Sequence, residues 1–272
     1  MLDAEMPSSI LSKAFYLLRA FNSRERVMTL SELTRASGLP KSTVHRLLAR
    51  LVELGAIESH GAGYKLGLEL FQLGSVTPAY AMRDTAMPHL AAVHRWTGRT
   101  VSLALLRGFD VVYLERVVPC GEAPDPFGVG SRVPANCTAM GKALLAYEHP
   151  DDLASLMRNP LRALTPRSIT DAGELTSQLR SVRRGELARA SGEARRGIAC
   201  VASPIIVKGC AVGAISVSHP VGAKLDPRMD GVLRETTARL GREVQAGLAD
   251  QRAPWFPPSI TDPELNLMRN AG

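Results

Sequence analysis

Apolar side chains recur at helical spacing in the first part of the chain and predict three short helices. The first helix follows a Ser8-Ser9 cap and runs to about Asn22, with its apolar positions at Ile10, Leu11, Ala14, Phe15, Leu17, Leu18 and Phe21. We expect Ser31 to cap a second helix that ends at Gly38. Pro40 suits the entrance of the third helix, because the first turn needs no N–H from it. Two short helices joined by so tight a turn are typical of a helix-turn-helix.

The third helix has one apolar and one polar face. Spacing of i, i+3, i+4 and i+7 predicts a buried stripe of Val44, Leu47, Leu48 and Leu51. At about 100° per residue, the opposite face carries Ser42, Arg46 and Ala49, flanked by Thr43 and His45. Arg46 can pair with guanine or phosphate, and the free N–H groups near Lys41 favour phosphate. Glu53 would repel phosphate further along, so we expect only the first half of the helix to enter a major groove.

A β-hairpin is predicted directly after this helix. Residues 56–59 and 64–66 have strand character, and the glycines of His60-Gly61-Ala62-Gly63 permit the turn between them. An ordinary helical bundle with a solvated basic face is the alternative. The order of turn, caps, polar face and hairpin favours a winged helix-turn-helix that binds double-stranded operator DNA. The candidate DNA-binding residues are Lys41, Ser42, Thr43, His45, Arg46, Arg50, His60 and Tyr64.

The remainder of the chain alternates helical and strand patterns, which predicts an α+β fold with an antiparallel sheet. An apolar segment broken at Pro78 reads as a linker helix. We expect further helices at 87–96, 139–147, 172–184 and 228–248, and antiparallel strand pairs at 100–106 with 111–116 and at 198–207 with 211–218. The expected organisation is a winged helix-turn-helix domain (1–67), a linker helix (68–83), a second domain (84–250) and a flexible tail (251–272).

Length and charge agree with this division. The 272 residues exceed the usual size of one domain, and 33 Lys and Arg against 26 Asp and Glu give a net charge of +7. That excess alone is weak evidence for nucleic acid. No apolar run is long enough for a membrane span, and Asp3 and Glu5 stand where a secretory signal would be basic. We therefore expect a cytoplasmic protein with no membrane partner.

Signals for catalysis and for metal binding are missing from the sequence. The four cysteines, Cys120, Cys137, Cys200 and Cys210, show no close pairing and are expected to be buried free thiols, and the six histidines lack metal-ligand spacing. No nucleophile elbow or phosphate-binding loop is present, and Val133 stands where a dinucleotide fingerprint after Gly128-Val-Gly130 needs glycine. We predict no enzyme activity, no metal and no cofactor. A non-catalytic interaction or signalling module is the alternative to a DNA-binding regulator.

Two parts of the chain carry motifs that are specific enough to resemble a known family. The segment from Leu30 to Leu73, with Ser37 to Leu48 and Tyr64 to Gly67, resembles the winged helix-turn-helix of the IclR family of bacterial transcriptional regulators. The chain also resembles the effector domain of that family, in order, at 130–134, 139–146, 169–171, 182–185, 193 with 197–204, and 214–220. The resemblance as a whole covers roughly residues 8–249. The resemblance implies a GAF-like sheet, a small anionic metabolite as effector, and a homodimer or a homotetramer.

Candidate effector-binding residues come partly from the pattern and partly from this resemblance. Ser216 and Ser218 alternate along one predicted strand and so share a face. Met140 lies at the start of a helix, where free N–H groups can hold a carboxylate. The resemblance assigns the effector to Val133, Ala139, Met140, Cys200, Ser216 and Ser218.

The chain departs from the family pattern at one edge of the expected site. Several family members have an acidic residue shortly before the motif glutamate, whereas this chain has Arg189-Ala190-Ser191-Gly192 before Glu193. Arg189 turned inward would favour a more acidic ligand, but an arginine on the surface is the commoner arrangement.

Overall fold

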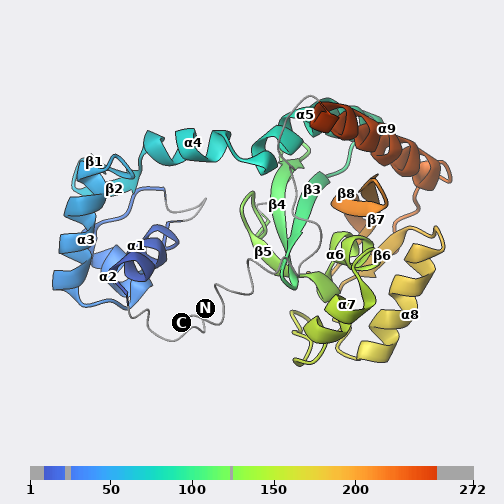
Figure 1. The fold of residues 1–272 in the computed structure, drawn as a ribbon, viewed down its shortest axis with the longest axis horizontal. Coiled ribbons are helices and arrows are strands. Elements are labelled where there is room, and N and C mark those ends of the chain that lie inside the picture. The colour runs from blue at the N-terminus through green and yellow to red at the C-terminus, as the bar shows by residue number, and fades with distance from the viewer. Residues whose placement is uncertain (1–8, 22–25, 123–124, 250–272) are drawn as a thin grey trace. The chain divides into compact units, whose positions relative to one another are not determined.

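The computed structural model describes residues 9–21, 26–122 and 125–249, and these fall into two compact units that meet at Thr77 and Pro78 (Figure 1). The expected flexible tail, 251–272, lies outside the described residues. Within those residues, no helix has the length and apolar character needed to cross a membrane.

The first unit is a winged helix-turn-helix. Its elements are α1 (Ile10–Leu18), α2 (Leu30–Ser37), α3 (Lys41–Glu53), β1 (Ile57–His60), β2 (Gly63–Leu66) and α4 (Leu68–Ser75). β1 and β2 form an antiparallel hairpin, and a backbone bridge from Met28 to Tyr64 adds a third short segment to it. One apolar core, which includes Leu17, Leu33, Val44 and Ile57, joins the helices to the hairpin.

The predicted cap of α2 was wrong by two residues. Thr29 is the N-cap, and Ser31 lies inside the helix. The Thr29 hydroxyl accepts from the Glu32 N–H, and the Glu32 carboxylate accepts from the Thr29 N–H at 2.8 Å. This reciprocal capping box satisfies two backbone donors, whereas a cap at Ser31 would satisfy fewer. Gly38 ends the helix, as predicted, in the left-handed conformation at φ 63°.

The second unit is a six-stranded antiparallel sheet with helices on both faces. Its strands are β3 (Val101–Arg107), β4 (Asp110–Val117), β5 (Arg132–Pro134), β6 (Ala188–Ser191), β7 (Ile198–Val207) and β8 (Cys210–Pro220). Its helices are α5 (Pro78–Thr97), α6 (Ala139–Leu145), α7 (Pro150–Leu156), α8 (Ala172–Arg183) and α9 (Met229–Ala249), with a 3-10 turn at Ala135–Cys137. The strand order is β5-β4-β3-β8-β7-β6.

Two apolar cores lie against the two faces of this sheet. α5 and α9 pack on one face, and α6 with α8 packs on the other (Figure 1). Side chains alternate between the cores along each central strand: Leu103 and Leu105 of β3 face α5 and α9, and Ala104 faces α6. Burial on both faces explains why β3 is almost wholly apolar and does not alternate with polar residues.

Other expectations for the second unit need correction. The helix expected at 87–96 is the second half of α5, which begins at Pro78 and continues through Pro88. Met82, Ala86, Leu90 and Val93 keep helical spacing and are all buried, so packing outweighs the hydrogen bond that Pro88 removes. The short elements β5, β6 and α7 were not predicted, because three to seven residues carry little periodic signal.

The cysteines were expected to be buried, and two of them are not. Cys137 is buried and Cys200 half-buried, but Cys120 and Cys210 are exposed. Cys120 lies in the turn after β4 and Cys210 is the first residue of β8, and both lie outside the two cores. All four thiols are free.

Candidate functional site: a DNA-reading helix and an effector cavity

The third helix presents a polar face to solvent. Val44, Leu47, Leu48 and Leu51 are all buried, as their spacing predicts. The remaining side chains of the helix include the candidates for reading DNA: Lys41, Ser42, His45, Arg46 and Arg50 are exposed and Thr43 is half-buried. The helix begins without a side-chain cap, because Pro40 holds the N-cap position. Its first-turn N–H groups are therefore left for an outside acceptor, such as a phosphate oxygen.

Arg50 differs from the other candidates because it already has an acidic partner. Its guanidinium lies 2.6 Å from the Glu53 carboxylate, and the Arg50 side chain is 75 % exposed. Exposed ion pairs of this kind are weak. Glu53 engages only Nη1 of Arg50, and it lies beyond the half of the helix expected in the groove.

The hairpin supplies the two remaining candidates. His60 is exposed at the end of β1, beside the turn at Gly61. Tyr64 is half-buried and packs against the core, and its backbone pairs with Met28. The structure therefore leaves His60 open to DNA, whereas much of the Tyr64 ring is occupied by packing.

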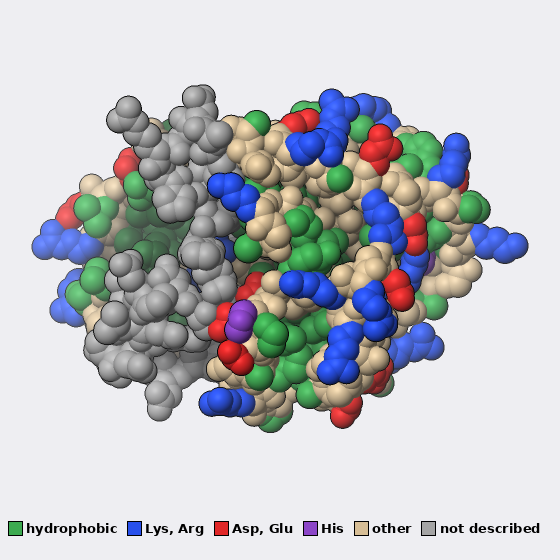
Figure 2. Space-filling model, turned by 45° about the vertical axis from the view of Figure 1, so that its right-hand side comes forward, with side chains coloured by type: hydrophobic (Ala, Val, Ile, Leu, Met, Phe, Trp, Pro, Cys, Tyr) green, Lys and Arg blue, Asp and Glu red, His purple; other side chains and the backbone are tan. Residues whose placement is uncertain are grey.

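The described residues on the face of the molecule shown in Figure 2 form no continuous basic patch. On the face shown in Figure 2, Lys and Arg side chains are scattered and interspersed with Asp and Glu. The net charge of +7 is therefore no evidence that this face binds DNA. The candidate DNA-binding residues lie instead on the polar face of α3 and on the hairpin.

A small cavity lies on the α6 face of the six-stranded sheet. It has a volume of about 40 Å³ and is lined from β3, β4, β7, β8, the start of α6 and the loops around Asp125 and Glu193. Pockets for drug-sized ligands have roughly 300 to 1,000 Å³. The cavity is therefore suited to a compact molecule. Five of the six predicted effector residues line it: Ala139, Met140, Cys200, Ser216 and Ser218.

Val133 is the sixth candidate, and it does not line the cavity. It is fully buried in β5, opposite Val111, and belongs to the core around α6. Its contribution is to packing beside the cavity.

The polar side chains that β7 and β8 contribute to the cavity are neutral. The Cys200 thiol and the Ser218 hydroxyl lie 3.3 Å apart on paired strands. Burial raises the pKa of the Cys200 thiol, although the hydrogen bond with Ser218 lowers it in part. Cys200 therefore stays protonated at neutral pH. Ser216 lies between Ser102 and Ala202 in the register and adds a second hydroxyl to the same face.

The start of α6 is held close to the turn before it. Thr138 caps the helix by accepting from the Gly141 N–H at 2.9 Å. A Cβ at Gly141 would lie 2.1 Å from the Ala135 carbonyl oxygen, so only glycine fits there. This close approach places Ala139 and Met140 at the edge of the cavity.

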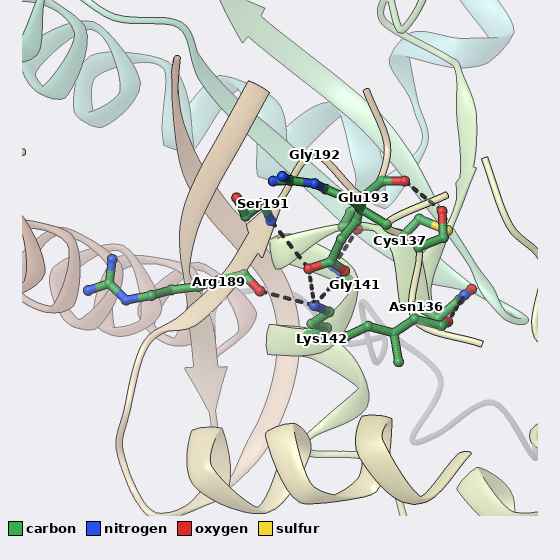
Figure 3. Close-up of polar contacts among 12 residues, drawn as sticks. Asn136, Cys137, Gly141, Lys142, Arg189, Ser191, Gly192 and Glu193 are labelled. Atoms are coloured by element: carbon green, nitrogen blue, oxygen red, sulfur yellow. Dashed lines mark hydrogen bonds and ion pairs between the residues drawn. The ribbon is translucent and has the colours of Figure 1, made fainter. Parts of the chain in front are cut away.

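A buried ion pair forms the wall behind that edge. Lys142 reaches from α6 to Glu193, with Nζ 2.6 Å from Oε2, and also donates to the Arg189 carbonyl at 3.1 Å (Figure 3). The side chains of Lys142 and Glu193 are only 1 % and 9 % exposed. Burial lowers the pKa of Lys142, and the hydrogen bond and charge of Glu193 raise it in part. The pair fixes the segment from Arg189 to Glu193 against α6.

Arg189 turns away from the cavity. Its guanidinium donates to both Asp230 carboxylate oxygens, at 2.7 and 2.8 Å, and its side chain is 54 % exposed. The option of an inward Arg189 that favours a more acidic ligand is therefore excluded. Ala190 lines the cavity in its place.

Several charged and aromatic cavity residues were missed from the sequence. Arg116 and Tyr113 of β4 line the cavity together with Asp125 and Arg195. Tyr113 and Arg116 are three residues apart, so strict alternation would put them on opposite faces of the sheet. An irregularity in the β3–β4 register skips Leu114 and brings both onto the cavity face. No signal in the sequence marks that bulge. Among the described residues, no cluster of His, Cys, Asp and Glu could hold a metal ion.

A winged helix-turn-helix joined to a sheet domain with a small polar cavity defines a DNA-binding transcriptional regulator with a ligand-binding domain. Two family models match the chain: the IclR helix-turn-helix domain over residues 10–61 and the bacterial transcriptional regulator IclR C-terminal domain over residues 75–241. The chain belongs to the IclR family of bacterial transcriptional regulators, as the sequence motifs predicted.

Sequence relatives and solved structures also support membership of this family. The HTH-type transcriptional regulator XynR of Escherichia coli is 29 % identical over 91 % of this chain and 97 % of its own length. The probable transcriptional regulator SauR of Cupriavidus necator is 33 % identical over 75 % of this chain and 84 % of its own. An IclR homolog from Microbacterium hydrocarbonoxydans, complexed with 4-hydroxybenzoate, has a TM-score of 0.79 at 27 % identity and covers 88 % of this chain and 100 % of its own.

Proposed function

We propose that the protein is a ligand-responsive regulator in which two copies of α3 enter successive major grooves of a near-palindromic operator. The observation that carries this proposal is the exposed polar first half of α3 beside an uncapped helix start. Lys41 and Arg46 contact phosphates or base edges, and His60 of the hairpin reaches the flanking backbone.

Self-association is part of the proposal, because two reading heads require at least a homodimer. Exposed apolar side chains on α1 and α4, including Ile10, Phe15, Leu68 and Leu73, support it. Further pairing would give a homotetramer. Chromosomal DNA as partner places the protein in the cytoplasm.

The cavity of the second unit is proposed as the effector site. Its hydroxyl, thiol and guanidinium groups suit a small organic acid. The Microbacterium homolog, whose structure contains 4-hydroxybenzoate, supports an aromatic or short acid. An acid that binds the DNA-competent and incompetent states with different affinity changes operator binding by that difference. The proposal assigns no catalytic step to the protein.

The DNA assignment is tested with a duplex selected by the full-length protein from a random library. Arg46→Ala is expected to weaken binding by roughly 1 to 3 kcal/mol if Arg46 reads a base. Arg184→Ala changes an exposed arginine at the C-cap of α8, makes the same change of charge in the second unit and is the matched control. Equal affinity of both variants and the wild type in an anisotropy titration would remove Arg46 from the reading surface.

A further inference from the structure

We propose that Arg116 is the anion-binding residue of the cavity and that Asp125 limits the acid it accepts to a single negative charge. The inference rests on the proposed function of the cavity as effector site and names the chemical class of its ligand.

Arg116 is a buried cation, and one of its three guanidinium nitrogens has no hydrogen-bond partner among the described residues. Its side chain is 10 % exposed. Nη2 donates to the Asp125 carboxylate at 2.9 Å, Nη1 donates to the Phe127 carbonyl, and the guanidinium lies 5.6 Å from the centre of the Tyr113 ring. Nε is buried and has no hydrogen-bond partner among the described residues. Because Arg116 lines the cavity, a carboxylate that enters it lies beside a buried guanidinium, and charge-assisted hydrogen bonds of this kind are strong.

The charged groups of the cavity lining, together with Lys142 in the wall behind it, sum to one positive charge. Arg116 and Arg195 both lie on the Asp125 carboxylate, at 2.9 and 3.1 Å, so one anion is shared by two cations. Glu193 is neutralised by Lys142 in the wall. One additional negative charge would therefore make the cavity neutral.

The ionisation states support this count. Burial raises the pKa of Asp125. Hydrogen bonds from Arg116 and the Phe127 N–H lower it, as do the charges of both arginines, and the lowering is the larger effect. Burial raises the pKa of Tyr113 and that of Cys200, so both side chains remain neutral. At neutral pH, Asp125 is the fixed counter-ion of the two arginines.

The net positive charge favours a ligand with one negative charge over ligands of similar size with none or two. A monocarboxylate places its anion against Arg116 and its polar remainder near the hydroxyls of Ser216 and Ser218. A dicarboxylate leaves one negative charge uncompensated in a largely buried space, and a neutral amide leaves the positive charge unmatched.

Calorimetric titration of the full-length protein tests the inference with three groups of probes. The monocarboxylates are lactate, benzoate and 4-hydroxybenzoate, the neutral probes are the corresponding amides, and the dicarboxylates are malate and phthalate. Arg116→Met should raise the Kd of the bound monocarboxylate at least about tenfold and leave the weak binding of its amide unchanged. Arg132→Met, an exposed arginine of β5 outside the cavity, should bind as the wild type does.

Asp125→Asn supplies a second readout that does not depend on Arg116→Met folding. Removal of the internal anion should shift the ratio of dicarboxylate to monocarboxylate affinity about tenfold or more toward the dicarboxylate. An unchanged ratio would overturn the role of Asp125, and wild-type affinity in Arg116→Met would overturn that of Arg116, while the effector function stands. If the wild type binds none of these acids, both the inference and the proposed effector site are wrong.

Discussion

Loss of the Glu193 carboxylate is expected to destabilise the second unit strongly. Lys142 Nζ lies 2.8 Å from Oε1 and 2.6 Å from Oε2 of Glu193, and only the Arg189 carbonyl would remain as its partner in Glu193→Ala. Truncation of one member of a buried ion pair costs about 3 to 5 kcal/mol, because the other charge stays buried and unpaired. At roughly 2 to 4 °C per kcal/mol for a unit of this size, the Tm should fall by about 6 to 20 °C.

The pH dependence of this variant gives an independent check. Burial already lowers the pKa of Lys142 below 10.5, and without Glu193 the pKa falls further. Between the pKa of Lys142 in the folded variant and 10.5, the unfolded chain binds more protons than the folded chain does. The free energy of unfolding therefore rises with pH in this range. The deficit of Glu193→Ala should therefore shrink as pH approaches 10.5.

Thermal unfolding of a double-mutant cycle is the assay for this prediction. Wild type, Glu193→Ala, Lys142→Met and the double variant are followed by circular dichroism. The double variant should lose less stability than the sum of the single variants, because neither charge remains unpaired. Additive losses, or a Tm for Glu193→Ala within about 2 °C of the wild type, would refute a buried pair that carries this energy.

Two further stability predictions concern single backbone features. Thr29→Ala removes the cap of α2 and should cost about 0.5 to 2 kcal/mol, whereas Ser31→Ala, inside the helix, should change little in the same urea titration. Gly141→Ala places a methyl 2.1 Å from the Ala135 carbonyl oxygen and should cost more than about 1 to 3 kcal/mol. Gly231→Ala in α9 meets open space and should stabilise by up to about 1 kcal/mol, so equal effects at both glycines would contradict the close approach.

The faces of α3 could be predicted from the sequence because local periodicity determines them. Val44 and Arg46 lie on opposite sides of a regular helix, and nothing distant alters that relation. The cap of α2 was also readable: Thr29 precedes Glu32 by the spacing of a capping box, and this pair is a stronger signal than Ser31 alone.

The charged part of the cavity could not be predicted in the same way. Tyr113 and Arg116 share a face only because β4 bulges at Leu114, a feature without a mark in the sequence. Arg195 donates to the Asp125 carboxylate although the two residues are 70 positions apart in the sequence, so only the folded loops bring them together. Ser216 and Ser218 were found because regular alternation along β8 is a local property. Local alternation therefore predicted the two hydroxyls of β8, the family resemblance supplied Cys200, and tertiary packing determined the charged residues of the cavity.

An acid bound in the cavity of an effector-controlled regulator changes the affinity of the protein for DNA. The direct measurement is an anisotropy titration of the selected operator duplex, with and without a saturating acid whose binding calorimetry has established. A change in operator Kd of about 5- to 150-fold is predicted, in either direction. An operator Kd that stays the same while the acid demonstrably occupies the protein would contradict the account.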